Sequence, residues 1–579
     1  MPNPPPQLAA STTIRFRSLV MLSTTSAILL WLSFAVGGIL STLTFIALVP
    51  LMLLVRLPTR LRPLYTSAYI GGFVFYTLGL YWLGYSAPEW WQSALMVVAL
   101  AGYCAIYFPL FLFAARILNR VWSVPALLAF PVAWVALEWV RTTLMTGFGW
   151  LAISHSLSKW TWTIQIADLG GAYAVSFLAV LVNAMVVEML IHPLMLGDKF
   201  DPTRRLRWRL LVTAAAILGT GVYGWWRVSE TNQIAKPGPR VVLLHSAIPQ
   251  SVKDGDFQTA NKRMLALAVK YREEKADLLV FPETSLALTY GEVAPELGDL
   301  DLAKLFIRRE LPGGPTKDWP LEASTGKELR AIMEDSRRRL LELAEDQNKP
   351  VLVSLLRRSF NQGSYLKYNS AILTVPRKGE AGVYDKLHLV PFGEYLPLKD
   401  SLPFLRWLMP YGPNESFGLD HAEKIKTIHY ENLNFGALIC FEDTVPWIAR
   451  AMVNLADPPI DFFVNPSNDG WFRGSIQADY HLASAVFRCV ETRKPMARAT
   501  NIGVTCLVDS TGRVSDIQSR FEDGALIVTV PLDSRKTVYA AWGDWLPKFS
   551  GFLALGYLAA TGIVVFRRTR ERLQGGPSQ

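Results

Sequence analysis

The stretch FGALICFE, residues 435–442, decides how the second half of the chain folds. Its apolar run is typical of a strand buried on both faces, and it ends at Cys440 just before a helical pattern at 443–456. Helical spacing recurs at 256–275, 326–347 and 475–492. Seven similar runs lie between residues 240 and 535: RVVLLHS, ADLLVFPE, PVLVSLL, YNSAILTV, IDFFVNPS, VTCLVDS and GALIVTV. This alternation predicts an α/β layered domain over 240–535.

The rest of the chain has the composition of a membrane protein. Hydrophobic residues make up 51% of the sequence and charged residues only 18%, and long apolar runs dominate residues 19–227. About 20 helical residues cross the roughly 30 Å of hydrocarbon in a bilayer. Eight segments meet that length: 18–36, 38–55, 64–85, 93–115, 121–140, 169–190, 209–227 and 548–566. We therefore expect a multi-pass α-helical membrane domain of seven helices over 18–227, with an eighth helix at 548–566.

Basic residues between these segments predict the orientation of the chain. Sixteen Lys and Arg lie in one set of alternate connections and only Arg141 and Lys159 in the other. Cytoplasmic loops carry the excess of basic residues, which makes 1–17 a cytoplasmic leader, 240–535 an extracytoplasmic domain and 567–579 a cytoplasmic tail. The sixteen are Arg15, Arg17, Arg56, Arg60, Arg62, Arg116, Arg120, Lys199, Arg204, Arg205, Arg207, Arg209, Arg567, Arg568, Arg570 and Arg572.

Charge and cysteine spacing narrow the possible functions. The net charge is +10, but the basic residues are divided among short clusters, so a nucleic-acid partner is not expected. The cysteines form no CxxC pair and no spacing typical of a metal site. A transporter is disfavoured because the predicted spans contain few ionisable residues; Glu138 and Glu188 lie near helix ends, where they can reach the interface.

Three strand-like runs end in residues that together could form a nucleophilic site. Glu283 follows ADLLVFP, Lys386 follows a Tyr-Asp pair, and Cys440 ends FGALIC. A carboxylate can take the thiol proton, the thiolate can attack a carbonyl, and an ammonium can stabilise the oxyanion. A helix starting after Cys440 would favour the thiolate. Singly, each has a structural interpretation: a core cysteine, a turn-capping glutamate and a solvated lysine.

The motifs around these residues resemble a known family. FPETS at 281–285, YDKLHLVPFGEYLP at 384–397 and LICFED at 438–443 are similar to the Glu-Lys-Cys motifs of the nitrilase superfamily. With NPSNDGWF at 465–472, RATNIGVT at 498–505 and the flanking apolar helices, the chain resembles the membrane-bound apolipoprotein N-acyltransferase family of that superfamily. The resemblance covers nearly the whole chain and implies an αββα sandwich for 240–535.

The resemblance also implies roles for residues and a reaction. Glu283 would be the general base, Lys386 the oxyanion stabiliser and Cys440 the nucleophile, with Glu394 and Glu442 as supporting carboxylates. The acyl donor would be a membrane phospholipid, held as a thioester on the cysteine. The acceptor would be the α-amine of a diacylglyceryl-modified apolipoprotein, and the enzyme would lie in a bacterial cytoplasmic (inner) membrane with its catalytic domain on the periplasmic side. No cofactor and no metal is implied.

Substrate contacts and rival functions complete the expectations. Phe404 and Trp407 lie in an apolar, aromatic segment suited to the membrane interface, and Trp471 is a further candidate substrate contact. The stretch 290–325, rich in Pro, Gly and charge, is interpreted as an insertion that forms either a lid or, in preference, a solvated loop. The rivals are a membrane-tethered nitrilase-type amidase or lipid hydrolase, a Cys-His hydrolase using His388 or His481, and an inactive scaffold.

Overall fold

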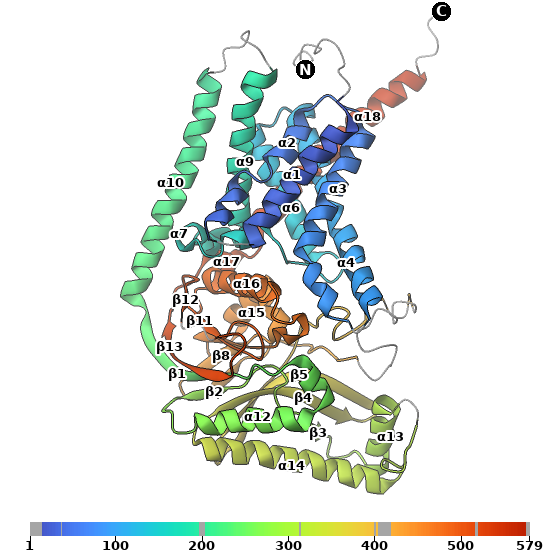
Figure 1. The fold of residues 1–579 in the computed structure, drawn as a ribbon, viewed down its shortest axis with the longest axis vertical. Helices are drawn as coiled ribbons and strands as arrows, with labels where there is room; N and C mark the ends of the chain where they lie inside the picture. Colours follow the sequence, from blue (N-terminus) through green and yellow to red (C-terminus); the bar gives the residue numbers. More distant parts are fainter. Residues whose placement is uncertain are drawn as a thin grey trace, which may run out of the picture.

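The computed structural model describes residues 14–35, 38–87, 89–195, 203–311, 314–398, 401–402, 418–515 and 519–574. A layer of long helices packs end-on against a two-sheet sandwich (Figure 1). The N-terminal half of the chain and its last helix form the helical layer, and residues from 236 to the mid-530s form the sandwich. The composition boundary in the sequence therefore coincides with a boundary in the fold.

Helices occupy each of the predicted apolar segments. They are α1 (Phe16–Ala35), η1 with α2 (Gly38–Phe45, Val49–Arg56), α3 (Leu61–Gly79), α4 with α5 (Trp90–Ala105, Tyr107–Arg116), α6 (Ala126–Thr143), α9 (Ala172–Met195), α10 (Thr203–Ile234) and α18 (Trp545–Gln574). Short turns connect them: η2 (Tyr81–Tyr85), η3 (Ile117–Val121), η4 (Ile153–Leu157), α7 (Thr161–Ile164) and α8 (Ala167–Gly170). Helix α6 begins at Ala126, later than expected, because Pro125 precedes it in an extended conformation.

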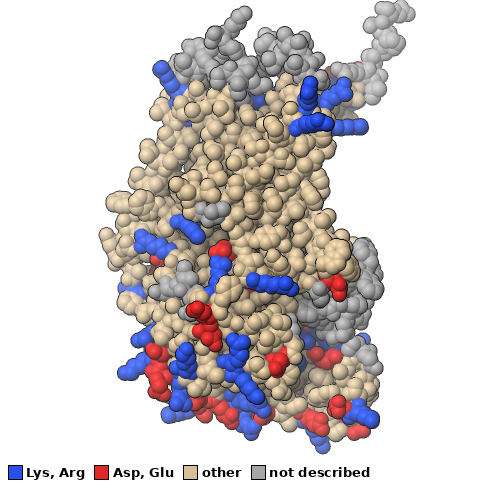
Figure 2. Space-filling view, viewed as in Figure 1, with Lys and Arg blue, Asp and Glu red and all other residues tan. Residues whose placement is uncertain are grey.

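Within the described residues, five of the eight expected segments meet the length and hydropathy needed to cross a membrane: Phe16–Ala35, Gly38–Arg56, Trp90–Val121, Ala172–Leu190 and Trp545–Glu571. This chain is therefore a membrane protein with several candidate transmembrane helices. Figure 2 shows the helical layer as a band of uncharged surface, with Lys and Arg at the end farthest from the sandwich and mixed charges over the sandwich itself. That distribution is the one expected of a protein embedded in a bilayer.

Glu138 and Glu188, which the sequence places near helix ends, are both buried in the helical layer. Glu188 forms ion pairs with Arg56 across 2.8 Å and with Arg209. Glu138 is 5% exposed and accepts a hydrogen bond from the Ile153 backbone N–H. A buried carboxylate needs such partners because its desolvation is costly. Both therefore hold helices and loops together.

The sandwich is built from two mixed sheets. One has the strand order β13-β1-β2-β4-β5-β6, with β3 paired to β4 outside that path, and the other has the order β12-β11-β10-β9-β8-β7. Strands β1, β2 and β4 run parallel, as do β8, β9 and β10. The bounds are β1 Lys236–His245, β2 Leu278–Val280, β3 Tyr290–Val293, β4 Val351–Asn361, β5 Ser364–Val375, β6 Gly379–Asp385, β7 Ile428–Tyr430, β8 Leu433–Ala437, β9 Phe462–Ser467, β10 Met496–Thr500, β11 Cys506–Val508, β12 Val514–Ser515 and β13 Gly524–Leu532.

Alternating side chains create the layers of the sandwich. In β1, Val242 and Leu244 join a core with Met264 of α12 and Leu340 of α14, whereas Val241 belongs to the core shared with the second sheet. Successive strand residues point to opposite faces, so β1 contributes side chains to both cores.

The helices of the sandwich domain are α11 Gln250–Gly255, α12 Phe257–Lys270, α13 Asp299–Glu310, α14 Ala323–Gln347, α15 Pro446–Leu455, α16 Gln477–Thr492 and α17 Val538–Trp542. The domain is a nitrilase-like α/β sandwich.

The described residues of the stretch 290–325 include regular secondary structure, which corrects the preferred expectation of a solvated loop. The stretch contributes strand β3, which lies parallel to β4, and helix α13, which packs against α14. Leu302, Phe306 and Ile307 of α13 are buried with Leu329 and Met333 of α14 in a small separate core. Helix α13 was not predicted, because the abundant Pro, Gly and charged residues on either side of it are typical of a loop.

Candidate active site

The three predicted reactive residues lie just after the ends of three strands. Glu283 follows β2, Lys386 follows β6, and Cys440 follows β8 as the first residue of the short 3-10 helix η8 (Cys440–Thr444). Ligand and catalytic sites commonly form at such strand ends, because the strands fix the positions of the residues beyond them. The structure brings the three side chains into one site.

Lys386 lies at the centre of the site. Its side chain is fully buried, and Nζ lies 3.3 Å from Glu283 Oε1 and 2.9 Å from Glu394 Oε1. Burial alone would lower the pKa of this lysine, but Glu394 and Glu283 outweigh burial and raise it. Lys386 is therefore a fixed and buried positive charge.

Asn369 is a site residue that the sequence did not reveal. It lies in the middle of β5, and its Nδ2 donates to Glu283 Oε1 across 2.8 Å and to Glu394 Oε1 across 3.1 Å. Because one amide and one ammonium hold both carboxylates, the two negative charges can stay close together. In the sequence, Asn369 is one polar residue near the start of the strand-like run YNSAILTV. A polar residue in that position is equally typical of a strand whose end is exposed to solvent, so it did not predict a site residue.

Glu394 and Glu442 support different parts of the site. Glu394 Oε2 accepts from the Val390 backbone N–H across 2.8 Å, closing the loop that carries it. Glu442 is fully buried and accepts from Tyr384 OH and from the backbone N–H groups of Leu387, His388 and Ile439, at 2.7–3.0 Å. Burial raises the pKa of Glu442 to about 7 in spite of these donors. Glu442 thus ties the segment after Lys386 to the residue before Cys440.

Cys440 is held in an unusual backbone conformation. Its φ of 49° lies in the left-handed region, which non-glycine residues adopt mainly at tight turns and functional sites. The residue retains partial exposure, and the backbone N–H of Asn468 faces its sulfur. The charges of Glu283 and Lys386 both act on its thiol.

The surroundings of Cys440 favour the neutral thiol, whereas the following helix was expected to favour the thiolate. Desolvation and the negative charge of Glu283 raise the pKa of Cys440 well above its ordinary value, although Lys386 and the Asn468 N–H act in the opposite direction. Attack on a carbonyl must therefore be coupled to removal of the thiol proton, and Glu283 is the carboxylate whose charge acts most strongly on that thiol.

His481 belongs to a buried charge cluster behind the nucleophile. Its ring nitrogens lie 2.8 Å from Asp443 and 2.7 Å from Asp469, and both aspartates also pair with Arg498. Burial disfavours the imidazolium, but Asp443 and Asp469 raise the pKa of His481 to about 9. A histidine already protonated at neutral pH cannot accept the thiol proton.

His388 also fits a structural role. Its ring lies against Phe441 with centroids 5.8 Å apart, and its backbone N–H binds Glu442. Neither histidine therefore supports a Cys-His pair.

The predicted substrate contacts are only partly described. Phe404 and Trp407 lie outside the described residues. Trp471 lies in η9 (Asp469–Phe472), directly after the segment whose Asn468 faces Cys440. The next residue, Phe472, packs edge-on against Trp82 of η2 with centroids 4.7 Å apart. One side of the site is therefore in contact with the helical layer. In the described part of the chain, no group of three or more His, Cys, Asp or Glu residues could hold a metal ion.

Comparison with known proteins gives matches over both parts of the chain. Residues 26–185 match the apolipoprotein N-acyltransferase N-terminal domain, and residues 245–539 match the carbon–nitrogen hydrolase family. The apolipoprotein N-acyltransferase of Rhodopirellula baltica is 28% identical over 95% of this chain and 98% of its own length. That of Geobacter metallireducens is 28% identical over 90% and 91%. An amidase from Nesterenkonia sp. aligns at 16% identity and a TM-score of 0.32, covering 52% of this chain and 93% of its own.

Proposed function

The chain belongs to the apolipoprotein N-acyltransferase family, a membrane-bound branch of the carbon–nitrogen hydrolases, and from this premise we propose its reaction and the residues that perform it. The enzyme moves an acyl chain from a membrane phospholipid to Cys440 and then to the N-terminal α-amine of a diacylglyceryl-cysteine lipoprotein. The observation that carries the proposal is the buried Lys386, ion-paired with Glu283 and Glu394 beside Cys440.

The first half-reaction acylates the cysteine. Glu283 removes the proton from the Cys440 thiol while the sulfur attacks the ester carbonyl of the phospholipid. The negative charge that develops on the carbonyl oxygen is stabilised by the Lys386 ammonium. When the tetrahedral intermediate collapses, the ester C–O bond breaks and the proton held by Glu283 passes to the lysophospholipid alkoxide. The thioester remains on Cys440.

The second half-reaction uses the same groups with an amine as the nucleophile. Glu283, again a carboxylate, takes a proton from the lipoprotein α-amine as its nitrogen attacks the thioester carbonyl. Lys386 again stabilises the oxyanion, the C–S bond breaks, and the thiolate receives the proton from Glu283. The products are an amide and the free thiol, so the cycle needs no other reactant.

Glu394, Glu442 and Asn369 act by positioning in this scheme. Glu394 and Asn369 hold Lys386 and Glu283, and Glu442 connects the Lys386 loop to the nucleophile turn. Phe404, Trp407 and Trp471 are proposed to contact the lipid chains, because aromatic side chains are favoured at membrane interfaces.

We further propose that the eight helical passes all cross the bacterial inner membrane. Exposed Lys and Arg residues gather at the end of the helical layer away from the sandwich (Figure 2), which supports a periplasmic catalytic domain and cytoplasmic termini. Both substrates are lipid-anchored, and removing an acyl chain from a bilayer costs about 0.8 kcal/mol per CH₂. A catalytic domain seated on the membrane avoids that cost.

Mass spectrometry of the intact protein tests the proposal. Wild-type protein incubated with phospholipid vesicles should gain the mass of one acyl chain on Cys440 and release lysophospholipid. Cys440→Ala, Glu283→Gln and Lys386→Met should gain none. Lys367→Met is the matched control, because Lys367 is also an ion-paired lysine with little exposure, and its partner is Glu310 rather than Glu283 or Glu394. An acyl adduct on another residue, or none on wild type, contradicts the proposal.

A further inference from the structure

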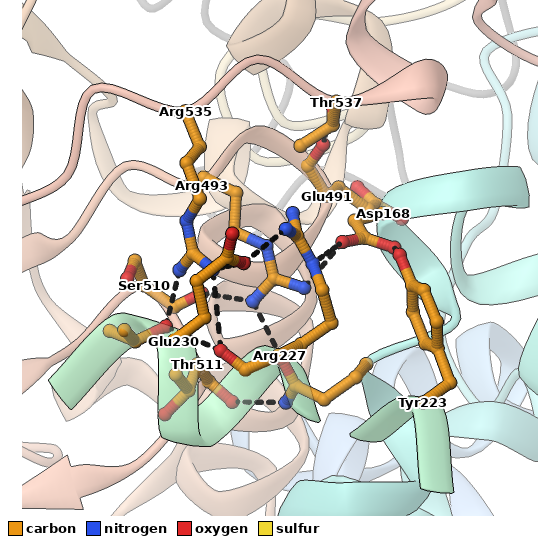
Figure 3. A network of polar contacts seen from close by, with 12 residues as sticks. Asp168, Tyr223, Arg227, Glu230, Glu491, Arg493, Ser510, Thr511, Arg535 and Thr537 are labelled. Atoms are coloured by element: carbon orange, nitrogen blue, oxygen red, sulfur yellow. Dashed lines mark hydrogen bonds and ion pairs between the residues drawn. The ribbon is translucent and has the colours of Figure 1, made fainter. Parts of the chain in front are cut away.

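A buried group of charges joins the helical layer to the sandwich. Asp168 in α8 is 1% exposed and accepts from Arg227 Nε across 2.8 Å, Arg493 Nη2 across 2.6 Å and Tyr223 OH across 2.7 Å. Tyr223 and Arg227 belong to α10, whereas Arg493 directly follows α16 of the sandwich. Figure 3 shows these three side chains converging on the Asp168 carboxylate.

A second carboxylate extends the group across the same boundary. Arg535, from the sandwich, binds Glu230 of α10 across 2.7 Å and also contacts Thr231 and Asp533. Arg227 completes the connection by pairing with Glu230 across 2.6 Å. We call Asp168, Arg227, Glu230, Arg493, Asp533 and Arg535 the junction cluster. Its three arginines balance its three carboxylates, so the cluster is neutral as a whole and can remain buried.

Exposed tryptophans lie around the junction cluster, where the helical layer meets the sandwich. Trp162, Trp225, Trp226 and Trp545 lie close to it in sequence on α7, α10 and α18 and are exposed. Tryptophan is enriched at membrane–water interfaces. Arg227 lies over the ring of Trp226, 5.4 Å from its centroid. The exposed tryptophans thus place the junction cluster near the bilayer surface.

Helix α16 connects this junction to the nucleophile. Its first turns carry His481, whose Nε2 lies 3.2 Å from the Cys440 carbonyl oxygen, and its last residue precedes Arg493. Sixteen residues at about 1.5 Å each make a strut of about 24 Å. Because an α-helix of this length is rigid, a shift at Arg493 would be passed on to Cys440.

We propose that the junction cluster is a positioning device that holds Cys440 at a fixed height over the bilayer, so that the carbonyl of a membrane-held lipid reaches it. Asp168, Arg493 and Arg535 are positioning residues, since they touch neither substrate nor reacting atoms. The inference rests on the proposed function, because it takes Cys440 as the acyl acceptor. Its distinctive consequence is a defect confined to donors held in a membrane.

Two acyl donors separate positioning from a general loss of structure. The first is phospholipid in phosphatidylethanolamine–phosphatidylglycerol vesicles containing the purified protein, read as lysophospholipid release. The second is water-soluble p-nitrophenyl acetate, which transfers its acetyl group to the Cys440 sulfur and releases p-nitrophenolate, read as a burst. Asp168→Asn should lower the first rate at least tenfold and the second less than twofold. Asp479→Asn is the matched control, because it removes an exposed ion pair with Arg520 from the same helix and should change neither rate.

The outcomes are distinct. An equal loss with both donors, or an unchanged rate with vesicles, overturns the inference. If Asp168→Asn does not fold, the two rates are measured for Arg535→Lys instead. This variant leaves the Asp168–Arg493 pair intact and should show the same selective loss with vesicles. A wild-type protein that releases no lysophospholipid contradicts the proposed function itself, whereas an active wild type with unaffected variants contradicts only the positioning role.

Discussion

The Nδ2 atom of Asn369 donates a hydrogen bond to Oε1 of Glu283 across 2.8 Å, and this contact fixes which carboxylate oxygen can act as the base. Lys386 Nζ approaches the same oxygen. Both donors therefore converge on Oε1, and we expect the thiol proton to be taken by Oε2. The base is held from one side and can react on the other.

Substitution of Asn369 should slow acylation without removing a reacting group. Asn369→Ala removes donors from two carboxylates, and a hydrogen bond to a charged group contributes about 1.5–3 kcal/mol, which corresponds to a loss of roughly 10- to 100-fold. Asn369→Asp should be slower still, because it buries a third negative charge beside Lys386. Lysophospholipid release measured under single-turnover conditions checks the order. An Asp variant faster than the Ala variant would contradict this account.

The three proposed reactive residues and the carboxylates Glu394 and Glu442 lie in motifs that the sequence displays, whereas Asn369 does not. Glu283, Lys386 and Cys440 each follow a strand and lie in recognisable motifs. Asn369 lies within a strand, where only the fold places it opposite Glu283. Strand β10 was missed for a related reason: its residues include Arg498 and Thr500, which are buried in polar networks, so the strand lacks an apolar run. The spacing of apolar residues along the sequence predicts which side chains are buried in a core. It does not predict that a polar side chain is buried because a residue on a distant strand forms a hydrogen bond with it.

The stability of the protein should fall between pH 6.5 and 9 because of His481. Its folded pKa of about 9 exceeds the unfolded value of about 6.5, so its contribution is fully present below pH 6.5 and is lost as the pH rises through 9. A shift of this size corresponds to about 3 kcal/mol. Thermal unfolding in detergent at pH 6 and 9.5 should show a larger decrease for wild type than for His481→Gln. Parallel pH profiles for the two proteins would exclude a charged His481.

Alkylation should distinguish Cys440 from the other cysteines. The raised pKa of Cys440 means that its thiolate fraction, and so its rate with iodoacetamide, should rise about tenfold per pH unit up to pH 9. Cys104, Cys489 and Cys506 are buried free thiols and should react only after unfolding. Peptide mapping of the alkylated protein measures both effects. A plateau near pH 7 would instead show a thiolate at rest.

Labelling of single cysteines should reveal the orientation in the membrane. In a Cys440→Ala background, Lys304→Cys places a thiol on α13 of the sandwich, where Lys304 is exposed, and Ser578→Cys places one in the basic tail. A membrane-impermeant maleimide applied to intact spheroplasts should label the first and not the second, because the positive-inside rule puts the tail in the cytoplasm. Permeabilised spheroplasts, which should label both, are the control. Equal labelling before permeabilisation would refute the predicted orientation.

The order of the two half-reactions separates an acyltransferase from an amidase or a lipid hydrolase. All three would form a thioester on Cys440, but only the acyltransferase must protect it from water until the amine arrives. Lys386 and Glu394 are buried or nearly so, and the low exposure of the site limits hydrolysis. Isolated acyl-enzyme should therefore persist for longer than one turnover.

A diacylated cysteinyl peptide with a free α-amine should discharge this thioester, and the same peptide with an acetylated amine should not, because its nitrogen lone pair is no longer nucleophilic. The acyl mass on Cys440 should disappear as the same mass appears on the peptide. Discharge at equal rates with the two peptides would mean that water is the acceptor. The chain would then be a hydrolase built on the same Glu283, Lys386 and Cys440 geometry.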